Sequence, residues 1–419
     1  MDQLALKSTP TSKHGNSAGH PLLVDAILDE IRGSGPMSFA RFMDLALYHP
    51  IYGYYMRHDH KTDAEVPDHG LGEDRIGWAG DYVTNSDVSS VFARTLAKQM
   101  LQMDEQLGRP DPFTVVEMGA GKGTFARDFL DACRTLSPSL ADRLRYVIIE
   151  RSPAMQASQQ RALASSALDP WRVTWLSRLA ELGAESVAGT LFSNELVDAF
   201  PVHRIGIVDG MTRELFVDYD EGRFCGRWRP LSSPALHGYL ERLAELGVVL
   251  PDGARADINV HAVDWMEDVA RVLRRGFVLT VDYGHLAHDL YGPDRRGGTL
   301  LCYYHHMASD NPYERVGLQD MTAHVDFTTL ACVGQAAGLH VTGFTNQMSF
   351  LIGLGVEHLL ESMQPGSAEF QSVVQLLRPD GMGGTFKVLI QHKGVDAHEL
   401  DGLTFKPFFG SGLTERLVV

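Results

Sequence analysis

The sequence predicts an α/β fold built on a doubly wound parallel sheet with helices on both faces. Short, almost entirely apolar runs, such as FTVVEMG at 113–119 and FVLTVDYGH at 277–285, alternate with segments of helical periodicity. A strand that is buried on both faces needs an uninterrupted apolar run, and parallel strands need crossover connections that are usually helical. A chain of 419 residues can form one such domain with insertions, or two domains.

The N-terminal part precedes this alternating pattern. Residues 1–20 are polar and predict a disordered leader, and 21–110 predict a helical region. Apolar residues recur every three or four positions at 22–50, which predicts two helices broken at GSGP, with Ser38 capping the second. The elements expected next are an aromatic turn, YHPIYGYY at 48–55, that packs the N-terminal helices onto the sheet, a polar loop at 57–77 and a helix at 88–107.

The first half of the core is predicted at 111–200. Its first strand ends in glycines, and the helical stretch TFARDFLDACRTL follows. The further strands expected here are RYVIIE (145–150), VTWL (173–176) and TLFSNE (190–195), with a helix after the first of them.

Two insertions interrupt the core. Residues 201–257 predict a subdomain in which a β-meander precedes a helix. The second half of the core, 258–393, begins with the amphipathic helix INVHAVDWMEDVARVLRRG and ends with a strand in GTFKVLIQHK. Within it, 285–335 predict a loop-rich insertion, and 394–419 form a tail without a predicted element.

Composition argues against several classes of function. The net charge is −16 and no Lys/Arg block occurs, so we do not expect a nucleic-acid substrate, because phosphate neutralisation supplies most of that affinity. No apolar run reaches 18 residues, which predicts no membrane span. The four cysteines are scattered without a C-x-x-C pair, and the histidines lack ligand spacing. We therefore predict no metal and a reduced, cytoplasmic environment.

The stretch GAGKGT looks at first like the end of a loop for nucleotide phosphates. A Walker loop would need glycine at Val116, and Glu117 would then lie beside phosphate oxygens. The residue after Lys122 is Gly123 rather than a magnesium-binding Ser or Thr. A dinucleotide fingerprint is also imperfect, because Thr124 stands at the third glycine position.

EMGAGKG instead fits the [DE]-x-G-x-G-x-G pattern of S-adenosylmethionine loops at every position. This cofactor carries an ammonium and a sulfonium but no phosphate, so Glu117 would stabilise it, while Gly119 and Gly121 would let the backbone approach it closely. Glu150, at the tip of the next strand, can accept hydrogen bonds from both ribose hydroxyls. We predict S-adenosyl-L-methionine as the cofactor, with an NAD-type or ligand-free α/β domain as the alternative.

Longer blocks resemble the MidA family, which has the class I methyltransferase fold. The matching blocks are SFARFMDLALYHPIYGYY, GDYVTNSDVS, VVEMGAGKGTFARDFL, YVIIERSP, FSNELVDAFPVHR, VDYGH, GTLLCYYHH, QDMTAHVDFTTLA and MGGTFKVLI. They cover roughly residues 36–392. The resemblance implies a Rossmann-like methyltransferase fold, with an N-terminal helical region and the insertions described above.

The resemblance also implies roles for individual residues. Glu117, Gly119 and Gly121 would bind the methionine end of the cofactor and Glu150 its ribose. A loop containing Gly80, Asp81 and Thr84 would close over the cofactor. The residues implied to face the methyl group are Asn194, Glu195 and Asp198.

Each candidate in the acceptor region has a structural alternative. Asn194 could be a helix N-cap, and Asp198 could be first-turn charge of that helix. Tyr283 could be a buried tyrosine of a tight turn, but it remains a candidate for substrate binding. His324 and Asp326 are further substrate-binding candidates. For catalysis we place Glu195 first, with Asp198 or Asp326 second.

Mitochondrial members of the resembled family are complex I assembly factors and protein-arginine methyltransferases. The resemblance therefore implies arginine N-methylation of a partner protein, such as an NADH dehydrogenase subunit, in the cytoplasm or, for a eukaryotic chain, the mitochondrial matrix. A non-catalytic S-adenosylmethionine-binding assembly chaperone and a small-molecule methyltransferase are the alternatives. A homodimer is a further expectation.

Overall fold

The central sheet has the strand order β15–β16–β10–β5–β2–β3–β4, and β14 pairs with the end of β10. The computed structural model describes residues 19–57, 85, 90–164, 172–396, 399–406 and 417. The strands of this sheet are β2 (Phe113–Met118), β3 (Leu144–Ile149), β4 (Val173–Leu176), β5 (Val187–Asn194), β10 (Leu273–His285), β14 (Val325–Asp326), β15 (His340–Asn346) and β16 (Phe386–Lys393). The α/β class I methyltransferase-type architecture is therefore as predicted.

The sheet is mixed rather than wholly parallel. Strands β4, β3, β2, β5 and β10 run parallel, but β16 is antiparallel to both β10 and β15. The prediction of an all-parallel sheet is wrong at this edge. The apolar run of β16 is buried from Phe386 to Gln391, and burial on both faces gives the same pattern whichever way a strand runs.

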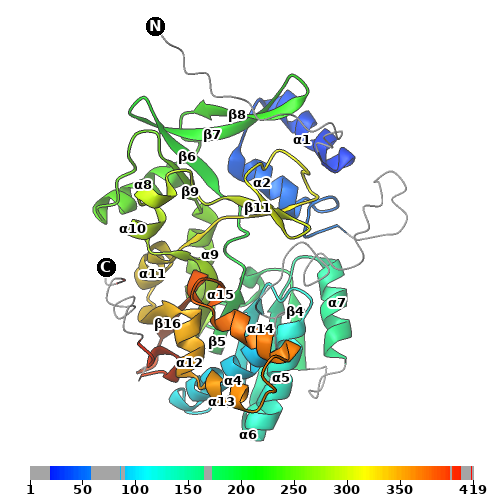
Figure 1. Cartoon of the computed structure of the whole chain (residues 1–419), viewed down its shortest axis with the longest axis vertical. Helices are drawn as coiled ribbons and strands as arrows, with labels where there is room; N and C mark the ends of the chain where they lie inside the picture. The colour runs from blue at the N-terminus through cyan, green and yellow to red at the C-terminus, as the bar shows by residue number, and fades with distance from the viewer. Residues whose placement is uncertain are drawn as a thin grey trace.

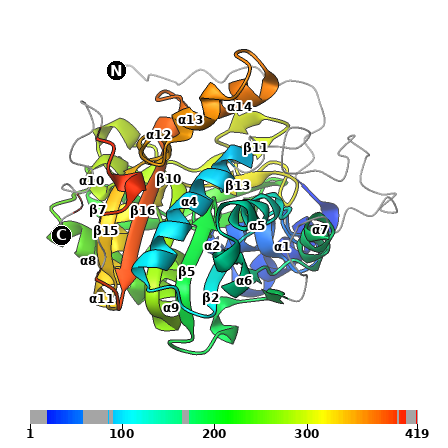
Figure 2. The same ribbon diagram turned by 90° about the horizontal axis from the view of Figure 1, so that it is seen from below.

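Helices cover both faces of the sheet (Figures 1 and 2). One face packs against α4 (Ser90–Gln106), α5 (Thr124–Leu136), α12 (Gln347–Gly353) and α14 (Ala368–Leu377). The other packs against α9 (Val260–Val272) and α11 (Phe327–Ala336). The remaining helices of the core are α6 (Pro138–Arg143), α7 (Pro153–Leu163), α13 (Val356–Glu361) and α15 (Met382–Thr385).

A second, antiparallel sheet lies above the core in Figure 1. It contains β1 (Met37–Ser38), β6 (His203–Val208), β7 (Met211–Asp220), β8 (Arg223–Arg229) and β9 (Arg255–Ile258). The helices α1 (Pro21–Ser34) and α2 (Phe39–Tyr48) pack with it in a separate apolar cluster, and α8 (Pro234–Glu245) follows β8. The β-meander predicted after residue 200 is thus present. The short strands β1 and β9 were not predicted.

The segment predicted as loop-rich holds regular structure. It contains α10 (Ala287–Leu290), a small antiparallel sheet of β11 (Leu301–Tyr304), β12 (Met307–Ser309) and β13 (Asp320–Thr322), the strand β14, and all of α11 except its last residue. Strands of three or four residues are too short to show an alternation of apolar and polar residues. The helix predicted to reach Gly276 ends at Val272, because Leu273 already pairs with Val187 in the sheet.

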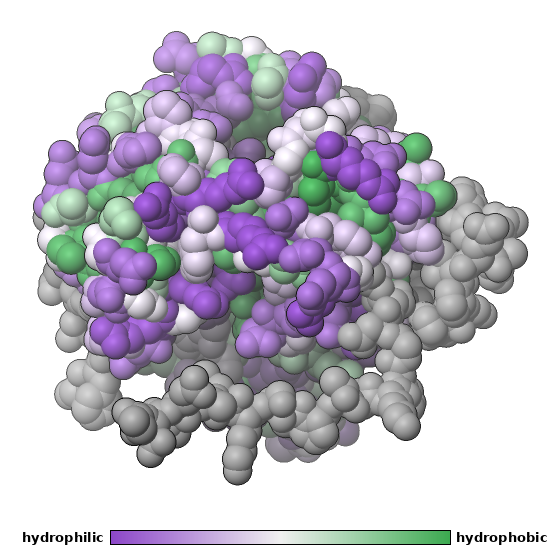
Figure 3. All heavy atoms as spheres, turned by 90° about the horizontal axis from the view of Figure 1, so that it is seen from above, coloured by the Kyte–Doolittle hydropathy of each residue, from purple (hydrophilic) through white to green (hydrophobic). Residues whose placement is uncertain are grey.

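The surface above the inserted sheet is mainly hydrophilic, and its hydrophobic side chains gather in small, separate groups (Figure 3). None of the helices within the described residues is long and apolar enough to cross a membrane. The two sheets and the N-terminal helices meet in the interior of the molecule.

Candidate active site

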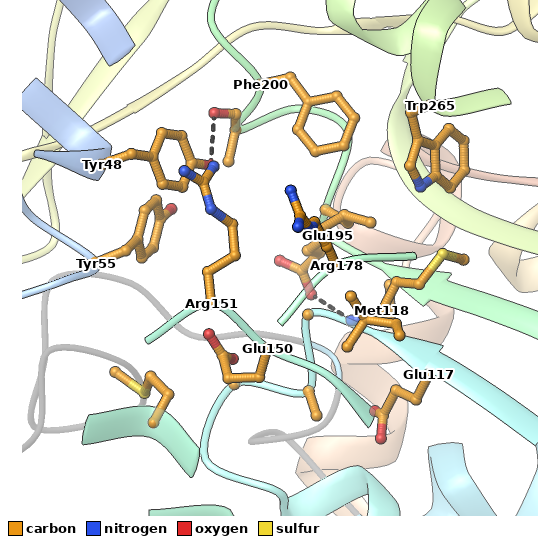
Figure 4. A pocket seen from close by; sticks show the side chains of 18 of the residues that line it. Tyr48, Tyr55, Glu117, Met118, Glu150, Arg151, Arg178, Glu195, Phe200 and Trp265 are labelled. Atoms are coloured by element: carbon orange, nitrogen blue, oxygen red, sulfur yellow. Dashed lines mark hydrogen bonds between the residues drawn. The ribbon is translucent and has the colours of Figure 1, made fainter. Parts of the chain in front are cut away.

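A cavity of about 440 Å³ opens at the carboxyl ends of β2, β3 and β5. Open α/β sheets place their ligands at this edge. Its walls come from the core and from the N-terminal region together (Figure 4). The side chains that line it include Tyr48, Tyr55, Glu117, Glu150, Arg151, Asn194, Glu195, Asp198, Phe200, Trp265 and Asp320.

The glycine-rich turn forms the floor of the cavity. Three residues of this turn, Gly119, Gly121 and Gly123, have positive φ angles of 74°, 50° and 84°. Residues other than glycine rarely adopt this backbone region. A Cβ on Gly123 would come within 3.0 Å of Gln159 Cα, and one on Gly119 within 2.9 Å of a Leu196 methyl. The turn is therefore restricted to glycine by its backbone angles and by its close approach to α7.

Glu117 is the acidic residue that precedes this turn. It lies on β2, is 3% exposed, and its Oε2 accepts a 2.8 Å hydrogen bond from the Tyr146 hydroxyl. Burial raises the pKa of Glu117 to about 8, and the negative charge of Glu150 adds to the increase, while the Tyr146 hydrogen bond opposes it. A cationic ligand group in this cavity would favour the ionised form of Glu117 and offset the effect of burial.

Glu150 follows β3 and is also held in place. Its Oε1 accepts the Ser152 backbone N–H at 2.8 Å, and its Oε2 accepts Gln159 Nε2 at 3.0 Å. Burial raises the pKa of Glu150, although these hydrogen bonds favour its ionised form. Gln159 Nε2 also donates to the Gly121 carbonyl at 2.9 Å. Gln159 thus links the glycine turn to Glu150, a role that no sequence pattern indicated.

After β5 the chain makes a turn, and no helix begins there. The N-cap interpretation of Asn194 and the first-turn interpretation of Asp198 are therefore wrong. Glu195 has a positive φ of 51°, and its Oε1 accepts Asn85 N at 2.9 Å and Asn194 Nδ2 at 3.1 Å. Asn85 Nδ2 donates to Asn194 Oδ1 at 3.1 Å, so these three residues form one hydrogen-bonded group.

Asp198 lies deeper than Glu195 and is 4% exposed. Its Oδ2 accepts a hydrogen bond from the Tyr283 hydroxyl, while its Oδ1 is buried without a hydrogen bond of standard geometry from any described residue. Burial raises the pKa of Asp198 to about 6, and the Tyr283 hydroxyl and the N–H groups of Asp198 and Ala199 oppose this increase. A carboxylate oxygen in this state can accept a hydrogen bond from a ligand.

The wall opposite the sheet comes from the N-terminal region and from the insertion at 285–335. The Tyr48 hydroxyl donates to the Ala199 carbonyl at 2.9 Å, and the Tyr55 hydroxyl donates to Asp320 Oδ1 at 2.6 Å. The two tyrosine rings stack with centroids 5.5 Å apart, and Asp320 is 1% exposed. Arg151 lies over the Tyr48 ring (Figure 4). The YHPIYGYY aromatics thus line the site as well as packing the helices, and Asp320 is a site residue that the sequence analysis missed.

All three predicted substrate-binding residues lie outside the cavity lining. Asp326 caps α11 by accepting the Thr329 N–H, and it also accepts the Tyr239 hydroxyl. His324 packs edge-on against Tyr283, with ring centroids 5.7 Å apart. Tyr283 reaches the cavity only through its hydrogen bond to Asp198.

Three of the predicted cofactor-binding residues, Gly80, Asp81 and Thr84, lie outside the described residues. Within the described ranges no group of three or more His, Cys, Asp or Glu side chains is arranged to hold a metal ion. The cavity therefore combines a glycine turn, two strand-tip carboxylates and a separate carboxylate–tyrosine region. The first two fit the ammonium and ribose of S-adenosyl-L-methionine by charge and by hydrogen-bonding capacity.

The fluorescence of Trp265 should report ligand binding in this cavity. It lies on α9, its Nε1 is buried without a partner among the described residues, and its ring is 6.1 Å from that of Phe200. We expect S-adenosylhomocysteine to change the tryptophan emission, because a ligand in the cavity alters the surroundings of this indole. Trp265→Phe should remove most of the change, whereas Trp228→Phe, outside the cavity lining, should keep it. A change that persists in full in Trp265→Phe would contradict this placement.

Comparison with known proteins agrees with this geometry. Residues 95–345 match a family described as "Putative S-adenosyl-L-methionine-dependent methyltransferase". A crystal structure from Burkholderia thailandensis, bound to S-adenosyl-homocysteine, is 30% identical with a TM-score of 0.79, over 91% of this chain and 94% of that chain.

Curated relatives are similar over nearly the full length. The Drosophila melanogaster protein named "Protein arginine methyltransferase NDUFAF7 homolog, mitochondrial" is 26% identical over 94% of this chain and 90% of its own length. A Xenopus tropicalis relative with the name "Protein arginine methyltransferase NDUFAF7, mitochondrial" is 24% identical over 91% and 88%.

Proposed function

This chain belongs to that family of S-adenosyl-L-methionine-dependent methyltransferases, and we propose that it methylates an arginine side chain of a partner protein. The observation that carries the proposal is the chemistry of the acceptor end of the cavity. Asp198, Glu195 and Asp320 line it beside Tyr48 and Tyr55. Carboxylates suit a planar cation such as guanidinium, and the chain's own Arg151 already lies over the Tyr48 ring in this wall.

The cofactor would occupy the region around the glycine turn. Glu117 would bind its ammonium, Glu150 its ribose hydroxyls, and the backbone of Gly119 and Gly121 would follow its methionine end. The loop that contains Gly80, Asp81 and Thr84 remains our candidate for covering it. When bound, S-adenosyl-L-methionine supplies a methyl group that is already activated by the sulfonium.

The chain's own residues would then align the acceptor nitrogen. Asp198 Oδ1 would accept an N–H of the guanidinium, and Glu195 would hold a second N–H beside it. As the nitrogen–carbon bond forms, the carbon–sulfur bond breaks with its electron pair on sulfur, and the acceptor nitrogen loses one proton to Asp198. A carboxylate with its pKa raised to about 6 is a better proton acceptor near neutral pH than an ordinary aspartate.

The relatives support arginine as the acceptor by their names, which describe protein arginine methyltransferases. The family resemblance also suggests the first partner to test, a subunit of a respiratory NADH dehydrogenase. Those relatives are named as mitochondrial proteins, while cytoplasmic location and homodimerisation remain predictions for this chain.

The test is transfer of radioactive methyl from S-adenosyl-L-methionine to an extract of cells that lack this chain. We expect the purified enzyme to label protein, and acid hydrolysis to release the label as methylarginine. Asp198→Asn, checked for S-adenosylhomocysteine binding, is the control. Label in the low-mass fraction would instead show a small-molecule methyltransferase, and normal ligand binding without any label would show a non-catalytic assembly factor.

A further inference from the structure

The carboxylate of Asp282 lies directly behind the turn that carries the acceptor-binding residues. Asp282 is at the carboxyl end of β10 and is fully buried. Its Oδ2 accepts the backbone N–H groups of Leu196, Val197 and Asp198, at 3.2, 2.9 and 3.4 Å. Its Oδ1 accepts the N–H of Tyr283 at 2.9 Å. One side chain therefore satisfies four backbone donors.

The carbonyls of the turn 195–198 have other partners, since Asn259 Nδ2 donates to the Val197 carbonyl at 3.0 Å and Ala323 N to the Asp198 carbonyl at 2.9 Å. The N–H groups of Leu196, Val197 and Asp198, in contrast, all donate to Asp282. Glu195 N donates to the Val281 carbonyl at 3.0 Å, which continues the ladder between β5 and β10 by one residue. Glu195 then adopts a φ of 51°, which is costly for a residue with a side chain. Successive N–H groups that point the same way form a site for a negative charge. In this turn the Oδ2 atom of Asp282 occupies that site.

We propose that Asp282 is a positioning residue for methyl transfer. By anchoring the three N–H groups it holds the turn in the conformation in which Glu195 and Asp198 both line the cavity. Asp282 itself is outside the cavity lining and acts through the turn. A test of this inference by turnover rests on the proposed function. A test by the exchange rate of the backbone amides in the turn does not.

The groups around Asp282 affect its pKa. Burial and the negative charges of Asp198 and Glu195 raise the pKa of Asp282, while the N–H groups of Val197 and Tyr283 oppose the increase. Lys387 lies opposite Asp282 in the strand register, but its ammonium donates to the carbonyls of Gly384 and Thr385. Asp198 and Asp282 therefore titrate as a pair. The other titratable groups next to Asp198 are Tyr48, Tyr283 and Tyr303.

The test compares Asp282→Asn with Thr280→Val. Thr280 lies two residues earlier in β10, and its buried Oγ1 has no partner among the described residues, so valine fits there without loss of a hydrogen bond. Asp282→Asn should keep S-adenosylhomocysteine binding and lower kcat about 10- to 100-fold through loss of alignment. Thr280→Val should behave as the wild type.

Hydrogen exchange gives a second readout that does not depend on an acceptor. In the wild type the amides of 196–198 should exchange as slowly as those of β10, and Asp282→Asn should accelerate exchange in this segment alone. Fast exchange of these amides in the wild type would overturn the inference, even if Asp282→Asn failed to fold. An unchanged kcat in folded Asp282→Asn would do the same. Absence of turnover in the wild type, with slow exchange of 196–198, would count against the proposed function and not against this anchor.

Discussion

Glu117→Gln should abolish useful cofactor binding and at the same time stabilise the ligand-free protein. The carboxyl is 3% exposed and burial raises its pKa to about 8. Removing one partner of a buried ion pair costs about 3–5 kcal/mol, so we expect the Kd for S-adenosylhomocysteine to rise at least 100-fold. Isothermal titration calorimetry measures this loss.

The gain in stability follows from the direction in which burial moves the pKa. Because the pKa is higher in the folded state than in the unfolded state, the contribution of Glu117 to stability is complete below about pH 4.5 and is lost as pH rises through about 8. A tenfold difference in proton affinity corresponds to about 1.4 kcal/mol, so the penalty at pH 7 is on the order of 3 kcal/mol. Glutamine carries no such penalty. Its Tm should be roughly 3 °C higher at pH 7, with little difference at pH 4.5.

Cofactor affinity of the wild type should depend on pH for the same reason. Below pH 8 the free protein holds a proton on Glu117, and that proton must leave before the carboxylate can bind an ammonium. The affinity for S-adenosylhomocysteine should therefore rise about tenfold per pH unit up to about pH 8 and then level off. Tyr146→Phe removes the hydrogen bond that favours the ionised form, so its plateau should begin at a higher pH. Tight binding by Glu117→Gln, or a flat pH dependence in the wild type, would refute this account.

The strand-tip carboxylates could be predicted from sequence because strand ends are local features. An apolar run gives the position of a buried strand, and the residues at its end lie at the edge of the sheet, as found for Glu117 within the end of β2 and for Glu150 just after β3. The depth of their burial was not predictable. It depends on Tyr146, 29 residues away in the chain, and on Gln159, which joins two loops.

The acceptor end of the cavity is built almost entirely from distant contacts. Tyr55 meets Asp320 across 265 residues, and Tyr48 meets Ala199 across 151. No spacing rule connects such pairs, which explains why the sequence pointed to His324 and Asp326 and missed Asp320. The turn after β5 resembles a helix start in sequence for a related reason. The residue that accepts the N–H groups of this turn is Asp282, on another strand.

Asp198→Asn should eliminate most methyl transfer without loss of the cofactor. Asparagine keeps the size of the side chain and an oxygen that can accept the Tyr283 hydroxyl, but it cannot take a proton or balance the charge of a guanidinium. Loss of a positioned proton acceptor typically costs about 10²- to 10⁴-fold, and we expect kcat to fall by about 10²-fold or more. The Kd for S-adenosylhomocysteine, measured by calorimetry, should change less than about threefold.

The pH profile of the wild type should identify the same group. Because the pKa of Asp198 is raised to about 6, kcat should fall about tenfold per pH unit below pH 6 and be level above it. Tyr283→Phe removes the hydroxyl that stabilises the ionised Asp198, so the acidic limb should move to higher pH. An acidic limb that stays near pH 6 in Tyr283→Phe would contradict its assignment to Asp198.

Glu195→Gln separates the two candidate carboxylates. From sequence alone Glu195 ranked first, but its Oε1 already accepts Asn85 N and Asn194 Nδ2, whereas Asp198 Oδ1 is buried without a hydrogen bond of standard geometry from any described residue. The amide oxygen of glutamine can keep the contact to Asn85, so Glu195→Gln should mainly raise the KM for the protein acceptor and leave the acidic limb near pH 6. If Glu195→Gln removes turnover and Asp198→Asn retains it, Glu195 is the proton acceptor. In that case the buried Asp198 serves only to hold Tyr283.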